Sequence, residues 1–283
     1  MNKNEIVYVS DCLLADLIGG GELNDHELCI GLNKNNFNVK KIRSYNFTLE
    51  KVDTDKFYII SNFALLKKEV KDKIQEKCKY IIYEHDHKYV ANRNPGAFAR
   101  FKAPAPMIIN RDFYNSAKKV FVLSKVCKEV IEDNLEIDNV HSIGCSLWSE
   151  EQLDMIRQIN HTSGKTSEYG ILDSTNQIKG TSQALEYCAK AGINPSMISS
   201  PDYVEFLTRL SLCEKFIFFP QVLETFSRVC AEAKMLDCKV VTTPKLVGFF
   251  SEEYSSMSGD ALNDKISEKI DAALLKFKEV IFE

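Results

Sequence analysis

The first half of the chain alternates short apolar runs with amphipathic stretches. Runs rich in Val, Ile, Phe and Tyr, as expected of buried strands, occur at Ile6–Ser10, Val39–Ile42, Phe57–Ile60, Tyr80–Tyr83, Val120–Leu123 and Val140–Ile143. Helical periodicity follows some of them, at Glu22 to about Asn33, Leu65–Lys77 and Lys125–Asn134. Strands that alternate with helices over ~145 residues predict a parallel, doubly wound sheet.

The pattern restarts after residue 148. A helix is expected over Ser149–Asn160, and further strands are expected at Tyr169–Leu172, Met197–Ser199, Lys215–Phe219 and just before Thr243. This predicts an α/β protein of two Rossmann-like, doubly wound parallel-sheet domains, residues 1–148 and 149–262, with a cleft between them. An amphipathic helix lies within residues 263–283, and it can pack on the N-terminal domain or against a partner.

Composition narrows the class of protein. The formal net charge is −4, from 36 Lys and Arg against 40 Asp and Glu, and we take this to exclude a nucleic-acid partner. No apolar run approaches the ~20 residues of a membrane span, and no signal-peptide pattern precedes the first strand. The nine cysteines form no C-x-x-C pair, so reduced core thiols and a cytoplasmic location are expected.

The most informative stretch is Phe216–Thr243, which reads as strand, loop, helix and strand. Glu224 and Glu232 stand in an E-x₇-E spacing, with the first placed just before the helix and the second about two turns into it. A helix of this length separates the two carboxylates by roughly 12 Å. The free N–H groups of a helix start attract phosphate oxygens. The stretch therefore predicts a site for a sugar, a diphosphate and a ribose.

A second motif precedes this stretch in the chain. A strand containing Gly170 leads to a loop with Lys179-Gly180, and the matching residues that follow are Pro220, Glu224, Thr225, Phe226, Ser227, Glu232 and Ala233. This order resembles the donor-binding half of retaining GT-B-fold glycosyltransferases of family 4. The resemblance implies that Lys179 neutralises the donor diphosphate and that Glu224 holds hydroxyls of the transferred sugar. It also implies that Glu232 holds the ribose and that the amides of Thr225–Arg228 hold phosphate.

Two positions depart from the family pattern. Ile171 stands where family members usually have an arginine that shares the phosphates with the lysine, and Thr225 stands where a glycine usually follows the first glutamate. Arg228, in the first turn of the expected helix, is a candidate to supply the missing charge, because a guanidinium group suits phosphate.

The first domain matches the family more loosely. Gly19, Gly20 and Gly21 follow the first strand and resemble a loop whose backbone amides approach the donor phosphate or the acceptor. Glycine is expected there for close approach and unusual dihedrals. His85 ends a predicted strand, where the family often has a histidine near the reacting sugar carbon, although a surface or structural histidine is also open.

Metal and nicotinamide chemistry find less support. Asp53-Thr54-Asp55 precedes a strand, whereas a metal-binding Asp-x-Asp of the other glycosyltransferase architecture should follow one, and His85-x-His87 has no third ligand motif. Asn24 replaces the third glycine of G-x-G-x-x-G. We therefore expect no metal and no cofactor.

These patterns together predict an enzyme, a hexosyltransferase-type glycosyltransferase that is retaining and metal-independent. It would move a sugar from a donor such as a UDP- or GDP-sugar to a hydroxyl of a glycan, lipid-linked or protein-linked acceptor. The expected catalytic residues are Glu224, Lys179 and His85; the donor-binding residues are Gly20, Gly21, Lys179, Thr225, Phe226, Ser227, Arg228 and Glu232. A nucleotide-sugar 2-epimerase, an NADP-dependent oxidoreductase and a non-catalytic nucleotide-sugar-binding protein remain as alternatives. The sequence leaves the oligomeric state open.

Overall fold

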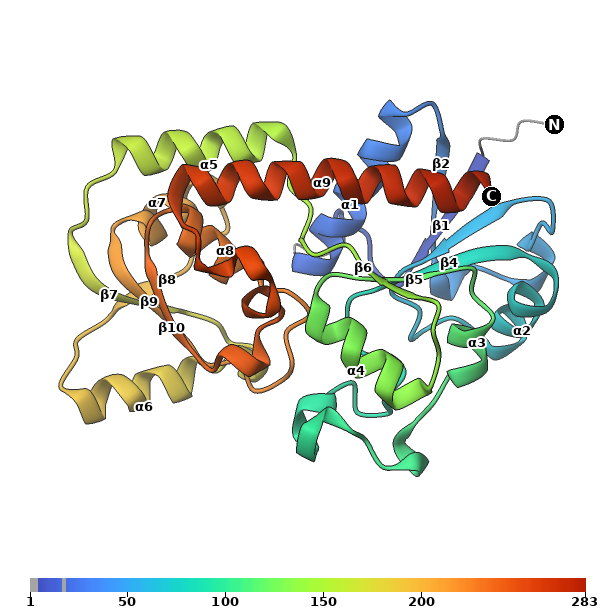
Figure 1. Ribbon diagram of the computed structural model, residues 1–283, viewed down its shortest axis with the longest axis horizontal. Coiled ribbons are helices and arrows are strands. Elements are labelled where there is room, and N and C mark those ends of the chain that lie inside the picture. The colour runs from blue at the N-terminus through green and yellow to red at the C-terminus, as the bar shows by residue number, and fades with distance from the viewer. Residues whose placement is uncertain (1–4, 17–18) are drawn as a thin grey trace. The chain divides into compact units, whose positions relative to one another are not determined.

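The computed structural model describes residues 5–16 and 19–283, which divide into two compact units (Figure 1). Unit 1 runs up to Trp148 and includes Ile270–Glu283, and unit 2 is Ser149–Lys269. The last helix, α9 (Gly259–Phe282), therefore contributes its first part to unit 2 and its second part to unit 1.

Unit 1 contains a six-stranded sheet in which every pair of neighbouring strands is parallel, in the order β2-β1-β3-β4-β5-β6. Its strands are β1 (Glu5–Ser10), β2 (Asn38–Arg43), β3 (Phe57–Ile60), β4 (Lys79–Glu84), β5 (Val120–Val122) and β6 (Val140–Ser142). The connecting helices are α1 (Gly20–Lys34), α2 (Lys68–Lys77), α3 (Arg111–Asn115) and α4 (Lys125–Leu135).

The core of unit 1 is built from residues that are distant in the sequence. β4 is buried along almost its whole length, as expected of a central parallel strand. Phe277, from the end of α9, is fully buried against Tyr83 of β4 and Phe121 of β5, with ring centroids 5.2 and 4.0 Å away. The end of the chain thus completes the core of unit 1.

Unit 2 has a four-stranded parallel sheet in the order β10-β9-β7-β8. Its strands are β7 (Ser167–Leu172), β8 (Ser196–Ile198), β9 (Cys213–Phe218) and β10 (Lys239–Thr242). Its helices are α5 (Glu150–Thr162), α6 (Thr181–Ala191), α7 (Tyr203–Ser211), α8 (Arg228–Met235) and the first part of α9. Fully buried Ile171 and Ile217 form a core with Ala184 and Cys188 of α6.

The predicted α/β class with two parallel sheets is confirmed, but two local predictions are wrong. Helix α1 begins at Gly20, so Gly20 and Gly21 are helical, and neither they nor Gly19 have a positive φ. A helix start needs no carbonyl partner for its first amides, so glycines can begin the helix in place of a loop. Helix α8 begins only at Arg228, so Glu224 lies well before it and the 12 Å helical estimate does not apply.

Two further predictions concern the state of the cysteines and the absence of a membrane span. All nine cysteines are free, and all except Cys12 and Cys78 are buried, which accords with the expected core thiols. Among residues 5–16 and 19–283, none of the helices combines the length and the apolar character that crossing a membrane requires.

Candidate functional site

The Lys179-Gly180 loop of unit 2 is held in place by a backbone contact that only glycine allows. Gly180 has φ 71° and precedes the first turn of α6. A Cβ atom at this position would lie 1.8 Å from the carbonyl oxygen of Phe219, at the end of β9. The amide of Gln221 also donates to the carbonyl of Ile178 at 2.8 Å. The two motifs that the sequence separates are therefore neighbours in the fold.

Lys179 and Glu224 meet in an ion pair. Lys179 Nζ lies 2.8 Å from Glu224 Oε1, and the two side chains are 33% and 13% exposed. Partly exposed pairs of this kind contribute about 0–1 kcal/mol, so a bound anion can take over the ammonium group at small cost. A cation and an acceptor of hydroxyl hydrogen bonds thus stand side by side, as a ligand with phosphate and sugar groups requires.

Glu224 is positioned by a segment that the sequence analysis did not consider. Its amide donates to the carbonyl of Leu246, and its carbonyl accepts from the amide of Gly248, both at 2.9 Å. These bonds make a parallel bridge between Glu224 and Val247. The backbone of Glu224 is thereby fixed on one side by residues that follow β10.

The residue two positions further on, Phe226, has a structural side chain. It is 1% exposed and packs edge-on against Phe249 at a centroid distance of 5.5 Å. Its carbonyl accepts from the amide of Phe249 at 2.9 Å. The ring of Phe226 therefore belongs to the core, and the predicted phosphate contact remains a prediction about its backbone amide.

Ser227, at the start of α8, has a strained backbone. Its φ of 74° and ψ of 85° are left-handed, and its side chain makes no cap to the helix. A serine in this position usually has an extended backbone and caps the helix. Left-handed non-glycine residues cost on the order of 1–3 kcal/mol and cluster at functional sites. The first amides of α8, which follow this turn, have no carbonyl partner within the helix.

Glu232 is buried among polar partners from the same unit. Tyr203, at the start of α7, donates its hydroxyl to Glu232 Oε1 at 2.7 Å, and Arg228 Nε lies 3.6 Å from the same oxygen. Burial and the charge of Glu232 raise the pKa of Tyr203 far above its usual value, so this phenol remains a hydrogen-bond donor. Sequence reasoning missed Tyr203, because nothing distinguishes it locally from the other tyrosines.

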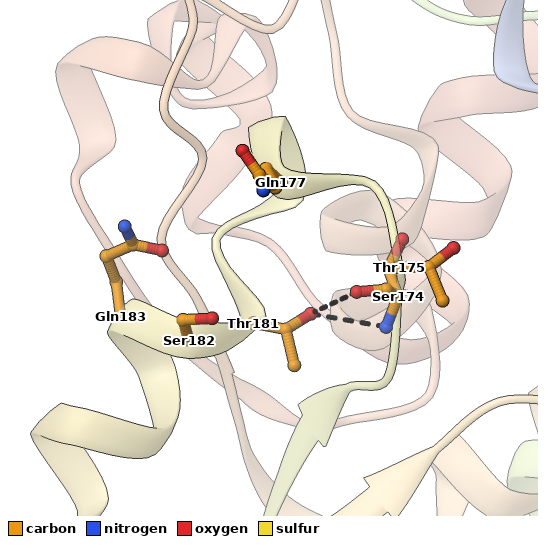
Figure 2. Close-up of a pocket in the computed structure, with 6 residues that line it drawn as sticks. All are labelled: Ser174, Thr175, Gln177, Thr181, Ser182 and Gln183. Atoms are coloured by element: carbon orange, nitrogen blue, oxygen red, sulfur yellow. Dashed lines mark hydrogen bonds between the residues drawn. The ribbon is translucent and has the colours of Figure 1, made fainter.

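A polar pocket of about 190 Å³ lies beside the Lys179 loop (Figure 2). Its lining consists of hydroxyl and amide side chains, from Ser174, Thr175, Gln177, Thr181, Ser182 and Gln183. The Thr181 hydroxyl donates to the carbonyl of Leu172 at 2.8 Å and accepts from the amide of Ser174 at 3.2 Å, which fixes the turn after β7. The lining carries no charge, so it suits neutral polar groups of a ligand.

His85 and the two glycines lie in unit 1. His85 Nε2 is 2.8 Å from Asp25 Oδ1, and Asp25 also accepts from the hydroxyls of Tyr8, Ser10 and Ser61. Burial opposes ionisation of Asp25, but His85 and the hydroxyls outweigh it and lower the pKa of the carboxyl. A Cβ on Gly21 would lie 3.8 Å from that of His85, an ordinary contact.

Sequence reasoning also missed Asp25. The available signal was a pair of polar residues, Asn24 and Asp25, on the buried side of α1. A buried carboxylate needs partners that compensate its lost hydration. Here those partners come from the ends of β1, β3 and β4, which gather at one edge of the parallel sheet.

The suspected metal motifs do not converge. In the described parts of the chain, no group of three or more His, Cys, Asp and Glu side chains is arranged to hold an ion. Glu84 instead pairs with Lys88 at 2.8 Å, and His87 Nδ1 lies 3.0 Å from the hydroxyl of Tyr89.

No protein-family model and no curated protein sequence matches the chain. Solved structures do share its fold over nearly the whole length. An α-glucosyltransferase in complex with UDP-glucose and DNA containing an abasic site has a TM-score of 0.52 at 12% identity, covering 99% of both chains. The catalytic domain of Arabidopsis thaliana starch synthase IV, bound to ADP and acarbose, has a TM-score of 0.57 at 6% identity, covering 98% of both chains. A trehalose-6-phosphate synthase has a TM-score of 0.58 at 8% identity, covering 95% of this chain and 91% of the other.

These structures correct the prediction about nucleic acid. The α-glucosyltransferase named above and two further α-glucosyltransferase structures of the same fold are in complex with DNA, and the DNA in the two further structures contains an HMU base. The prediction that the net charge excludes a nucleic-acid partner is therefore wrong. A net charge is a sum over the whole surface, whereas a polyanion responds to local charge. The comparisons establish that the chain has the fold of the GT-B glycosyltransferases.

Proposed function

We propose that this protein is a retaining, metal-independent glycosyltransferase of the family 4 type, which transfers a sugar from a nucleotide-sugar donor to a hydroxyl acceptor. The observation that carries the proposal is the ion pair of Lys179 with Glu224, held by the glycine contact between Gly180 and Phe219. Proteins of the same fold bind UDP-glucose or ADP, which supports a nucleotide sugar as the donor.

In this proposal the donor diphosphate displaces Glu224 from the ammonium group of Lys179. Lys179 then stabilises the charge that develops on the leaving diphosphate, which is the electrostatic contribution that usually dominates catalysis. The amides that begin α8, after the strained Ser227, add partial positive charge. The released carboxylate of Glu224 accepts hydrogen bonds from hydroxyls of the sugar.

Arg228 and Glu232 are assigned to the phosphates and the ribose of the donor. We assign Arg228 to the donor phosphates, in place of the arginine that the family pattern expects at Ile171. Arg228 Nε lies 3.6 Å from Glu232 Oε1, which is an ion-pair contact longer than a hydrogen bond. Glu232 is held by Tyr203 and would accept the ribose hydroxyls. Retention follows if the acceptor attacks from the face that the diphosphate leaves, with that diphosphate accepting the proton.

The acceptor class is widened by the comparisons. Because α-glucosyltransferases of this fold are found with DNA, a hydroxyl group on a nucleic acid stands beside glycan, lipid-linked and protein-linked hydroxyls as an acceptor. His85, oriented by buried Asp25, is assigned to the reacting sugar.

Thermal unfolding with a panel of UDP-, GDP- and ADP-sugars tests the donor site. At a ligand concentration of 100 times Kd, binding stabilises the folded state by about 2.7 kcal/mol, and we expect the melting temperature to rise by several degrees. Lys179→Ala should abolish the rise. Lys190→Ala is the matched control, because Lys190 also pairs with a glutamate, at 2.6 Å, but on the exposed face of α6.

The outcomes separate the alternatives. No rise with any nucleotide sugar, or an equal loss in both variants, contradicts the donor site. A rise without sugar transfer, donor hydrolysis or donor epimerisation identifies a binding protein and not an enzyme. Epimerisation of the donor without transfer identifies a nucleotide-sugar 2-epimerase. When a product forms, NMR of its anomeric proton tests retention, and activity that survives chelation supports metal independence.

A further inference from the structure

A long connection in unit 1 has an unusual charge. Residues 85–110, between β4 and α3, contain four Lys and Arg and a single acidic residue, Asp86. Acidic residues occur 40 times in the 283 residues of the chain, about one in seven, so a stretch of this length should contain three or four. The negative net charge of the chain therefore hides a locally basic segment.

Within this connection, Ala91–Met107 forms a closed surface loop, named here the basic loop. Its ends are joined by a bond from the amide of Ala91 to the carbonyl of Met107 at 2.9 Å, next to an antiparallel bridge between Val90 and Ile108. Compact loops with neighbouring ends are frequently functional. The loop carries the exposed cations Arg93, Arg100 and Lys102.

The basic loop has a defined shape in spite of its irregular backbone. Asn134, buried at the end of α4, accepts from the amide of Ala103 at 2.9 Å and donates to the carbonyl of Phe101 at 2.8 Å. The loop consequently runs beside the C-terminal end of α4 (Figure 1). A loop that is anchored in this way presents its charges with little loss of entropy on binding.

Its backbone also carries strain. Of the nine non-glycine residues with positive φ in the described chain, three lie in the basic loop, Arg93, Arg100 and Phe101. Two more, His87 and Asn110, flank it. Conformations of this kind persist where the surrounding structure enforces them, and they cluster at ligand-binding sites. This observation is independent of the charge.

The basic loop is connected to the candidate catalytic edge of unit 1. Arg93 pairs with Asp86 at 2.7 Å, and Asp86 directly follows His85. This ion pair ties the loop to the segment that carries His85, which Asp25 orients at the carboxyl edge of the sheet.

Arg100 makes no ion pair within residues 5–16 and 19–283, and its exposed guanidinium group is available to a ligand. Lys102 Nζ lies 3.3 Å from Asp133 Oδ1, in an exposed pair that a phosphate group can replace at small cost.

We propose that the basic loop is the docking surface for a nucleic-acid acceptor and that Arg100 and Lys102 contact its phosphates. Cations spread along an exposed loop suit the repeating phosphates of a polymer. Phosphate contacts of this kind position a nucleic acid without reading its sequence. This inference rests on the proposed function, because an acceptor is a substrate of the proposed sugar transfer.

The test is the salt dependence of DNA binding, measured by fluorescence anisotropy with a labelled duplex at 50–200 mM NaCl. Each lost phosphate contact makes the slope of log Kobs against log[salt] shallower by about 0.9. The double variant Arg100→Gln/Lys102→Gln should therefore change the slope by about 1.8 and weaken binding. The matched control is Lys67→Gln/Lys77→Gln, which removes the same charge from exposed positions at the two ends of α2.

An unchanged slope in the loop variant, or an equal change in the control, overturns the docking surface. Binding of polyphosphate without binding of DNA overturns the choice of nucleic acid. Should the double variant melt early, Arg100→Gln alone, with an expected change of about 0.9, decides the question. DNA binding through the loop without any nucleotide-sugar effect would refute the proposed function alone. Sugar transfer to another acceptor without DNA binding would refute the docking surface alone.

Discussion

Gly180 offers the sharpest test of how the candidate site is built, because Gly192 provides its matched control. Both glycines bound helix α6 and both have left-handed backbones, with φ of 71° and 67°. An alanine at either position costs roughly 1–2 kcal/mol for this conformation. At Gly192 the added methyl group meets nothing within 4 Å, so that cost is the whole expected effect of Gly192→Ala.

Gly180→Ala carries a second cost. Its Cβ would stand 1.8 Å from the Phe219 oxygen, and real Cβ contacts do not fall below 3.0 Å, so the loop and the end of β9 must separate by at least 1.2 Å. Such overpacking costs on the order of 1–3 kcal/mol. We therefore expect a loss of roughly 2–5 kcal/mol for Gly180→Ala. The separation would also move Lys179 relative to Glu224 and weaken donor binding.

Urea unfolding followed by circular dichroism measures both variants, and the nucleotide-sugar melting assay measures their donor sites. Equal destabilisation by the two substitutions would refute the steric argument. Retention of full donor binding by Gly180→Ala, with the expected loss of stability, would show that the contact supports the fold without positioning Lys179.

The remaining predictions concern buried polar groups. Burial opposes ionisation of Glu84, but Lys88 and hydrogen bonds outweigh it and lower the pKa of Glu84 to about 2 from 4.5. The ionised carboxylate therefore stabilises the protein fully above about pH 4.5. This contribution to the unfolding free energy should be lost as the pH falls from 4.5 to 2. Acid titration of the unfolding free energy should show this decline, and a Glu84→Gln variant with the same pH profile would contradict the assignment. Tyr203→Phe removes a hydrogen bond to buried Glu232 and should cost about 1.5–3 kcal/mol, measured by urea unfolding. Tyr169→Phe, which loses a part-buried bond from Lys215, should cost less, and the reverse order would refute the role of Tyr203.

The alternation of apolar runs was sufficient to predict both parallel sheets, because buried strands and amphipathic helices have distinct periods. It was less reliable at helix ends. α1 begins two residues before the predicted start, and α8 begins later than expected. Tertiary bonds decide the second case, since Glu224 is bound to the segment that follows β10 and cannot join the helix.

The sequence by itself determined the two-unit α/β class and the order of the Lys-Gly and Glu-x₇-Glu motifs, because both are patterns of neighbouring residues. Only the tertiary structure decided that Lys179 pairs with Glu224, that the ring of Phe226 belongs to the core, and that Asp25 orients His85. Each of these depends on contacts between distant segments and on burial, which no local pattern contains. The same reason explains the wrong nucleic-acid prediction: the net charge is a sum over the composition, whereas the fold decides which charged side chains are exposed together.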